Sequence, residues 1–311
     1  MFEAVLIAGP TASGKSAAAL ALAERLGGTI VNADSMQVYR ELRVLTARPS
    51  AAEMEIAPHF LYGTVSGREA YSVGHWVEDA AAAIDETRTR GRVPIFVGGT
   101  GLYFMGLLEG LSPVPDIPED IRRYWRERAA TAPGAELHAA LSERDPVMAA
   151  RLGPTDTQRL VRALEVINAT DVSLADWQET PGTPLLKDEA VLKILVAPER
   201  EALYTAIDAR FDAMLREGAL AEVESLAALD LDPGLPVMRA LGVPELLSHL
   251  SGDMGLEDAA TKAKTASRRY AKRQTTWARR FMSDWTQVPS GDAAAALIGA
   301  RSSGSVRPTR P

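Results

Sequence analysis

The chain contains no cysteine, which excludes disulfide bonds, thiolate catalysis and zinc sites with cysteine ligands. Its histidines are few and lie without metal-ligand spacing, so each is interpreted as a surface or packing residue: His59, His75, His138 and His249. No apolar run approaches the roughly 18 residues that a membrane-spanning helix needs. The N-terminus enters an apolar segment without a basic region or a cleavage site. These absences predict a cytoplasmic protein that does not bind membranes.

The composition that remains is that of a globular protein, with 311 residues of which 46% are hydrophobic and 24% charged. This length fits one large domain or two smaller ones. The net charge of −7 argues against a protein that coats nucleic acid indiscriminately. Segment 262–280 is the exception, because it carries eight lysines and arginines and no acidic residue. We expect these cations to contact a polyanion.

A phosphate-binding loop lies close to the N-terminus, where "GPTASGKS" matches the pattern G-x-x-x-x-G-K-[ST]. Its residues are Gly9, Pro10, Thr11, Ala12, Ser13, Gly14, Lys15 and Ser16. In this pattern Lys15 neutralises a diphosphate or triphosphate, the hydroxyl of Ser16 binds Mg²⁺, and the amides from Thr11 to Ser16 hold phosphate oxygens. These roles do not depend on the group to which the phosphates are attached.

Apolar strands alternate with helical patterns, which predicts an α/β fold: a parallel, P-loop NTPase-like sheet flanked by helices. Strands are expected at 4–9, 29–35, 93–97 and 190–197, with a helix over 16–28. Prolines in "LSPVPDIP" precede a stretch of short helical patterns, which indicates an all-helical insertion domain. The predicted division is 1–114 for the first part of the core, 115–186 for the insertion, 187–298 for the second part of the core with a basic C-terminal helix, and 299–311 for a disordered tail.

The carboxyl ends of parallel strands meet at one edge of a sheet, so Gly9–Ser16, Asp34-Ser35 and Gly98–Thr100 should converge on one cleft. Asp34 is the only acidic residue at the tip of a convincing core strand. It could bind magnesium, cap the following turn or act as a catalytic base. Thr100, after two glycines, also suits a turn or a helix N-cap.

Side-chain patterns predict the faces of several helices. Thr155 and Gln158 fit a capping box, so Arg159 and Arg162 would point outward as solvated side chains or as phosphate contacts. A buried stripe is expected from Leu160, Leu164 and Ile167, and a second from Leu203, Ile207, Phe211 and Met214. In the basic segment, an inward face is expected from Tyr270, Trp277 and Phe281.

Taken together, "DSMQVYR", "GGTGLY" and "QRLVRALEV" after the phosphate loop resemble the tRNA dimethylallyltransferases, or IPP transferase family. The resemblance implies transfer of a dimethylallyl group from its diphosphate to N6 of adenosine 37, in tRNAs that read codons beginning with U. The loop, with Lys15 and Mg²⁺ at Ser16, would then hold the departing diphosphate. Asp34 would take the proton of the amine, and Thr100 would position the base or the diphosphate.

The resemblance also implies a set of tRNA-contacting residues for the anticodon stem-loop, in a protein expected to be a monomer. They are Asp34, Ser35, Met36, Gln37, Thr100, Arg122, Gln158, Arg159, Leu160, Val161, Arg162, Arg239 and Gly242, together with Lys272 and Arg273 of the basic segment. The chain departs from many relatives at Val243-Pro244 and at Arg48, where they have lysine. Arg48 retains the positive charge.

Three alternatives remain open from the sequence. A small-molecule P-loop kinase would consume ATP and would not need the basic segment. A prenyltransferase acting on free adenine nucleotides would need neither that segment nor the insertion. An RNA-binding module with a vestigial loop would be expected to lose Lys15 or Asp34, and both are present.

Overall fold

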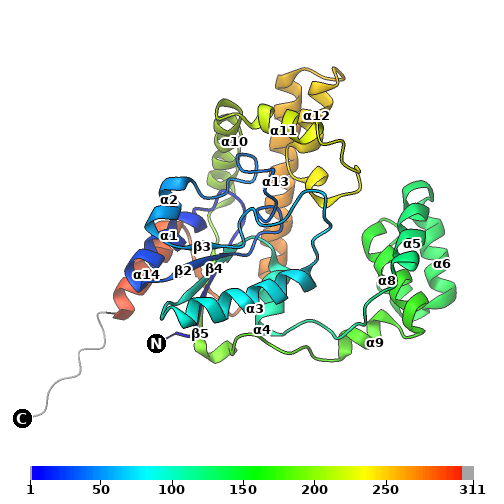
Figure 1. Ribbon diagram of the computed structural model, residues 1–311, viewed down its shortest axis with the longest axis horizontal. Coiled ribbons are helices and arrows are strands. Elements are labelled where there is room, and N and C mark those ends of the chain that lie inside the picture. Colours follow the sequence, from blue (N-terminus) through cyan, green and yellow to red (C-terminus); the bar gives the residue numbers. More distant parts are fainter. Residues whose placement is uncertain (1, 303–311) are drawn as a thin grey trace, which may run out of the picture. The chain divides into compact units, whose positions relative to one another are not determined.

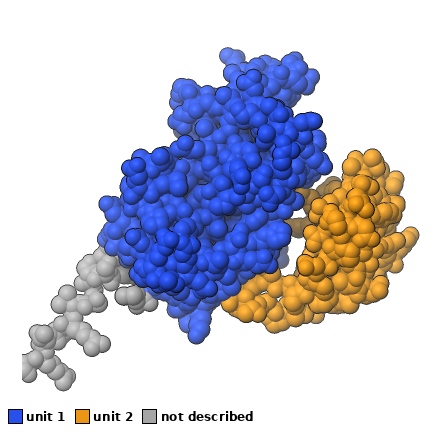
Figure 2. Space-filling model, viewed as in Figure 1, with its two compact units in different colours: residues 1–108, 185–311 blue, residues 109–184 orange. Residues whose placement is uncertain are grey.

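The computed structural model describes residues 2–302, with side chains up to 297, and the chain divides into two compact units (Figure 2). The core unit joins the chain up to Leu108 to the chain from Leu185 onward, and the insertion unit is Glu109–Pro184. This unit begins earlier than the predicted 115–186. The two linkers explain the difference, because a Cβ on Gly110 would lie 2.4 Å from the amide nitrogen of Thr183. The outgoing and returning chains therefore run side by side before the prolines are reached.

A six-stranded sheet forms the centre of the core unit, in the order β3-β2-β4-β1-β5-β6 with every neighbouring pair parallel (Figure 1). The strands are β1 (Ala4–Ala8), β2 (Thr29–Asn32), β3 (His59–Phe60), β4 (Pro94–Gly98), β5 (Val191–Val196) and β6 (Thr286–Val288). This parallel sheet confirms the predicted α/β class. The edge strands β3 and β6 were not predicted, because two and three residues are too short to show a periodicity.

Alternation along the buried strands directs side chains to two separate apolar clusters, one on each face of the sheet. Val5 and Ile7 of β1 pack in the cluster that includes helix α1 (Lys15–Leu26), whereas Leu6 packs in the cluster that includes Trp76 and Phe104. Figure 1 shows α1 and α14 (Gly291–Ser302) together on one side and α3 (Val73–Thr89) with α4 (Gly101–Leu108) on the other. Helices on both faces exclude water from the sheet. A ligand can therefore reach the sheet only at the ends of its strands.

The core unit contains the helix expected after the phosphate loop and the helix expected in the basic segment, together with several helices that were not predicted. The helices of this unit are α1 (Lys15–Leu26), α2 (Ala51–Ile56), α3 (Val73–Thr89), α4 (Gly101–Leu108), α10 (Arg200–Arg216), α11 (Ala219–Ala227), α12 (Val243–Leu250), α13 (Leu256–Phe281) and α14 (Gly291–Ser302), with 3-10 turns η1 (Asp188–Ala190) and η2 (Pro236–Arg239). The expected stripe of α10 is buried at all four positions, Leu203, Ile207, Phe211 and Met214. Gly27 ends α1 with a φ of 61°, the left-handed conformation that favours glycine.

The insertion unit is built from helices alone within its described residues. They are α5 (Glu119–Thr131), α6 (Gly134–Arg144), α7 (Pro146–Ala149), α8 (Thr157–Thr170) and α9 (Leu174–Glu179). Its own core contains Trp125, Leu141, Leu160 and Leu164, all essentially without solvent exposure.

The capping box predicted at the start of α8 is wrong. The helix begins at Thr157 and its N-cap is Asp156, which makes no side-chain cap. Instead the Asp156 carboxylate accepts the amide of Gly153 at 3.1 Å and stabilises the preceding turn. The N-cap position is thereby shifted by one residue from Thr155, so Gln158 is not at the third helical position.

Two further predictions concern the C-terminal tail and membrane-spanning helices. The expected disordered tail, 299–311, overlaps α14 over 299–302, and 303–311 lies outside the described residues. Among helices of the described part of the chain, none has both the length and the apolar character required to cross a membrane.

Candidate active site

The phosphate loop connects β1 to α1, and its backbone is held in an unusual conformation. Gly14 has a φ of 85° and Ala12 has a φ of 62°, so two left-handed residues curve the chain back on itself before the helix begins at Lys15. The ammonium of Lys15 donates to the carbonyl of Pro10 at 3.1 Å. The loop and Lys15 therefore lie at the N-terminal end of α1, where an anion is stabilised.

One loop amide is already occupied. The amide of Thr11 donates to the side-chain oxygen of Gln274, on α13, at 3.1 Å. The sequence had assigned phosphate oxygens to all amides from Thr11 to Ser16. In this structure the Thr11 amide instead joins the loop to α13.

Lys15 titrates abnormally, because burial lowers its pKa to about 8. The nearby Asp34 carboxylate opposes this effect and Arg210 adds to it. Burial also lowers the pKa of Arg210, again opposed by Asp34. Lys15, Arg210 and Asp34 are therefore electrostatic neighbours at one site.

Asp34 and Thr100 are brought together by hydrogen bonds at the ends of β2 and β4. The Thr100 hydroxyl accepts the amide of Ser35 at 3.0 Å, and the Thr100 amide donates to the carbonyl of Ala33 at 3.2 Å. The Asp34 carboxylate accepts the amide of Met36 at 3.0 Å through Oδ1. Asp34 therefore does form a local turn, as one interpretation expected, while Oδ2 accepts no hydrogen bond from the described residues.

Three tyrosine side chains lie within electrostatic reach of the Asp34 carboxylate. Burial, followed by the charge of Asp34, raises the pKa of each of the side chains Tyr62, Tyr103 and Tyr270. These three residues come from the β3 side of the sheet, from α4 and from α13. The raised pKa values keep these phenols protonated and neutral near the acid.

The glycines after β4 are required by close packing. A Cβ on Gly98 would lie 1.9 Å from the carbonyl oxygen of Ala33, and a Cβ on Gly99 would lie 2.1 Å from the side-chain nitrogen of Gln274. Gly98 has no space for a side chain, and a side chain at Gly99 would displace the Gln274 amide. This contact explains why β4 ends in glycines and Thr100 rather than in an acidic residue.

A cleft of about 580 Å³ lies beside the phosphate loop and contains several cations. It is lined by loop residues, including Lys15 and Ser16, and by Arg43, Arg48 and Arg210. Glu53 and Glu217 also line it, so the charge is mixed but predominantly positive. Asp34 is not among the lining residues and acts on the cleft through its charge.

Arg43 and Arg210 were missed by the sequence reasoning. Neither belongs to a short motif, because Arg43 lies in an irregular loop and Arg210 lies at the edge of the buried stripe of α10, one turn from Ile207 and from Met214. Only the structure shows what positions Arg43. The carboxylate of Glu222, on α11, accepts hydrogen bonds from the amides of Arg43, Val44 and Leu45 at 2.5–2.9 Å. A single carboxylate thereby holds the loop that carries Arg43 towards the cleft.

The predicted residues Ser35, Met36 and Gln37 lie directly after Asp34 and are all half-buried. The amide group of Gln37 donates to the carbonyls of Thr46 and Ala47, at 2.8 and 3.2 Å. In this structure the Gln37 side chain therefore stabilises the loop that precedes Arg48.

The metal prediction rests on Ser16, whose side chain is exposed at the first turn of α1. Among the described residues, no group of three or more acidic, histidine or cysteine side chains is placed to hold a metal ion. A single hydroxyl fits Mg²⁺ that is bound mainly by phosphate oxygens and water, the usual pattern for this ion.

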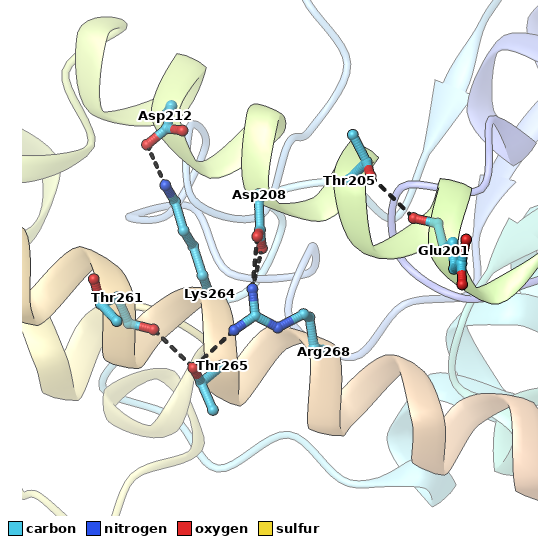
Figure 3. A network of polar contacts seen from close by, with 8 residues as sticks. All are labelled: Glu201, Thr205, Asp208, Asp212, Thr261, Lys264, Thr265 and Arg268. Atoms are coloured by element: carbon cyan, nitrogen blue, oxygen red, sulfur yellow. Dashed lines mark hydrogen bonds and ion pairs between the residues drawn. The ribbon is translucent and has the colours of Figure 1, made fainter.

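The basic segment forms most of α13, and two of its eight cations are neutralised by α10. Lys264 pairs with Asp212 at 2.6 Å, and Arg268 pairs with both carboxylate oxygens of Asp208 at 2.6 Å (Figure 3). The guanidinium of Arg268 also donates to the hydroxyl of Thr265. The local sequence contains no acid, but the partners come from a helix more than fifty residues earlier.

The other cations of α13 are exposed: Lys262, Arg269, Lys272, Arg273, Arg279 and Arg280. Trp277 packs inward as predicted, whereas the prediction for Phe281 is wrong, because its side chain is 43% exposed at the last residue of the helix. The helix buries small residues, among them Ala263, Ser267 and Ala271, and these allow its close approach to the core.

In the insertion unit, Gln158 and Arg159 are exposed on the first turn of α8, while Leu160 and Val161 are buried in the unit's core. Arg162 pairs with the buried carboxylate of Glu165 at 3.7 Å. Arg126 pairs with the same carboxylate at 3.4 Å. Arg122 donates to the carbonyl of Ile117 at 3.1 Å, so it closes the first turn of α5.

The last two predicted residues, Arg239 and Gly242, lie in the core unit. Arg239 is exposed at the end of η2. Gly242 precedes α12 with a φ of 91° and lies against Leu45 and Phe211. Gly242 therefore supports the loop near Arg43 by its backbone shape.

Comparison with known proteins agrees with this geometry. The IPP transferase family model matches residues 37–281, and an isopentenyl transferase model matches residues 2–61. A tRNA dimethylallyltransferase of Methylocella silvestris is 56% identical over 89% of this chain and 92% of its own. Another, from Bradyrhizobium sp. (strain ORS 278), is 53% identical over 96% of each chain.

Solved structures show the same similarity. The full-length tRNA isopentenylpyrophosphate transferase of Bacillus halodurans is 33% identical, with a TM-score of 0.69 over 98% of this chain and 96% of its own. A eukaryotic dimethylallyltransferase acting on tRNA is 27% identical, with a TM-score of 0.82 over 100% of this chain and 81% of its own. The chain belongs to the IPP transferase family, and it is an enzyme of the tRNA dimethylallyltransferase type.

Proposed function

We propose that this enzyme transfers the dimethylallyl group of dimethylallyl diphosphate to N6 of adenosine 37 in tRNAs that read codons beginning with U. The observation that carries this proposal is that two parts of the site, here called half-sites, meet at one edge of the sheet. The diphosphate half-site is the phosphate loop with its neighbouring cations, and the acid half-site is Asp34 with Thr100. A phosphate loop follows β1, Asp34 follows β2 and Thr100 follows β4, and a hydrogen bond from the Ser35 amide to the Thr100 hydroxyl joins the last two segments. The first half-site suits a diphosphate and the second suits a weakly acidic amine.

The diphosphate half-site stabilises the leaving group. Breaking the allylic C–O bond develops positive charge on the five-carbon group and negative charge on the diphosphate. Lys15, Arg48 and Arg210 line the cleft beside the loop and lie where that negative charge grows. These cations and the free loop amides lower the barrier because they interact more strongly with the departing anion than with the intact ester.

The acid half-site removes the proton. An aromatic amine is a poor nucleophile, so a base that accepts its proton during attack assists the reaction. Asp34 provides Oδ2 for this purpose, while Oδ1 is held by the Met36 amide. Thr100 holds the Ser35 amide at 3.0 Å and so maintains the orientation of the Asp34 turn.

Mg²⁺ would be held by the Ser16 hydroxyl and by diphosphate oxygens, and when bound it would neutralise charge on the leaving group. The exposed Ser16 side chain supports this assignment. The lack of an acidic cluster among the described residues fits an ion that arrives with its diphosphate.

Transfer RNA would be bound by exposed cations of α13, chiefly Lys272 and Arg273, and by Arg122, Gln158, Arg159 and Arg162 of the insertion unit. The exposure of Lys272 and Arg273 supports phosphate contact. Adenosine 37 must leave its stack to reach the phosphate loop. We place this reaction in the cytoplasm and assign it to a monomer.

The test uses labelled dimethylallyl diphosphate, Mg²⁺ and an unmodified tRNA transcript, with a matched transcript that carries guanosine at position 37 as control. We expect label in the first transcript only, recovered after digestion as N6-(dimethylallyl)adenosine. Equal labelling of both transcripts would contradict the assigned position. Absence of label together with ATP hydrolysis would favour a small-molecule kinase, and labelling of free AMP instead of tRNA would favour a nucleotide prenyltransferase.

A further inference from the structure

One side-chain amide joins the two half-sites directly. Gln274 extends from the middle of α13, where it is half-buried. Its Oε1 accepts the Thr11 amide of the phosphate loop at 3.1 Å, and its Nε2 donates to the carbonyl of Gly99 at 3.0 Å. These partners are 263 and 175 residues away in sequence. The bonds therefore connect three separate segments of the core unit.

The two partners require an amide. The Thr11 backbone N–H needs an acceptor, and the Gly99 carbonyl needs a donor, so a single group must offer both. A carboxylate would present a second acceptor to the Gly99 carbonyl and add negative charge beside a loop that holds an anion. A methionine would have similar length and neither function. Glutamine is therefore specified by the hydrogen bonds as well as by size.

Packing around this amide is too close to be incidental. A Cβ on Gly99 would lie 2.1 Å from Nε2, and a Cβ on Gly101 would lie 2.2 Å from the ring of Trp277. Gln274 and Trp277 lie one helical turn apart on α13 and press on the same turn of the chain. Thr100 lies between these two glycines, so its position depends on α13.

We propose that Gln274 is a positioning residue for prenyl transfer: it holds the phosphate loop and the Thr100 turn at the separation that aligns the diphosphate with the acceptor amine. The proposal rests on the proposed function. Gln274 contacts neither reacting atom, and it acts through Thr11 and Gly99. Because it lies next to exposed Lys272 and Arg273, it also links the helix proposed to bind tRNA to the diphosphate half-site.

The first test compares Gln274→Met with the wild type and with Gln287→Met, a control at an exposed position on β6. Misalignment of reacting groups by about 1 Å costs on the order of 100-fold in rate, so we expect Gln274→Met to lower kcat by about 10- to 100-fold. Affinity for tRNA should stay within about two-fold. An unchanged kcat would overturn the proposal, and so would an equal loss in the Gln287→Met control.

Gln274→Glu tests the positioning role through the pH dependence of kcat, which would not change if Gln274 only filled space. Protonated glutamic acid has one donor and one acceptor, so it can replace both hydrogen bonds of the amide, whereas the carboxylate cannot donate to Gly99. We expect the ratio of variant to wild-type kcat to rise as the pH is lowered from 8 towards 5.5. A ratio that is independent of pH would contradict the positioning role.

Failure of this proposal differs from failure of the proposed function. If the wild type transfers label to tRNA and both Gln274 variants match it, only the positioning role is lost. If the wild type transfers no label, the function itself is wrong. In that case pyrophosphate binding, measured by titration calorimetry on the full chain, still tests the contact between Gln274 and the phosphate loop. Gln274→Glu should weaken pyrophosphate binding at pH 8. An unchanged Kd would show that this contact does not support the loop.

Discussion

At the scale of single residues, the account depends most on Asp34, which the structure places both in a turn and within electrostatic reach of Lys15. Asp34→Asn keeps the turn-forming oxygen and removes the base. We expect it to lower the single-turnover transfer rate by about 100- to 10,000-fold, the usual contribution of a general base. Binding of tRNA, measured by filter retention, should stay nearly normal. Near-normal transfer would mean that Asp34 serves only as a turn residue.

Lys15 predicts a dependence of binding on pH. Burial lowers its pKa to about 8, so in the ligand-free enzyme its positive charge is present below that pH and is lost above it. Affinity for pyrophosphate should therefore fall as the pH rises from 7 to 9. Lys15→Arg retains its charge throughout this range and controls for titration of the ligand. A wild-type profile no steeper than that of Lys15→Arg would contradict the interpretation.

The places of candidate site residues could be predicted from the sequence only where the residues follow a local motif. Lys15, Asp34 and Thr100 lie in short motifs at strand ends, and the structure brings them to one edge of the sheet. Gln274 could not be found this way, because its partners lie on distant segments. Arg210 has no motif either, and its importance follows from burial beside the cleft.

At the scale of elements, α13 combines structural and exposed cations. Arg268 pairs with Asp208 and its side chain is 29% exposed, so Arg268→Ala should destabilise the fold by about 0.5–1 kcal/mol. Affinity for tRNA should hardly change. Arg273→Ala should do the opposite, with near-normal stability, weaker tRNA binding and a salt slope reduced by about one.

Denaturant unfolding and salt-dependent tRNA binding, measured on both variants, distinguish these roles. Equal effects of Arg268→Ala and Arg273→Ala on tRNA affinity would show that pairing with the α10 carboxylates does not keep a cation of α13 from binding tRNA. An absence of any effect from Arg273→Ala would remove α13 from the proposed tRNA surface.

Element prediction succeeded where the periodicity was long. The central strands and α10 carry enough apolar residues to define a buried face. The short strands β3 and β6 acquire their structure from pairing with β2 and β5, which no local pattern reveals. Local pattern also fails for Phe281, which was expected to be buried. The apolar face of the helix continues in the sequence beyond the point at which the core ends, so Phe281 is exposed.

At the scale of the whole molecule, the insertion unit has an apolar core of its own and a buried charge within it. Glu165 is 4% exposed and pairs with Arg126 and Arg162. Glu165→Gln should destabilise this unit by about 1–3 kcal/mol, since both ion pairs of the buried carboxylate are lost. Exposed Glu143 on α6 offers the matched control, Glu143→Gln. Hydrogen exchange should show faster opening confined to 109–184, and unchanged protection there would contradict this assignment.

In the proposed reaction the phosphate loop holds the leaving diphosphate of a prenyl donor, not a nucleotide that is consumed. The most direct measurement supplies labelled dimethylallyl diphosphate, ATP, Mg²⁺ and unmodified tRNA together, and counts all products. We expect one diphosphate to be released for each dimethylallyl group transferred, with no ADP formed. Formation of ADP or AMP in step with the reaction, or diphosphate release without label in tRNA, would contradict it.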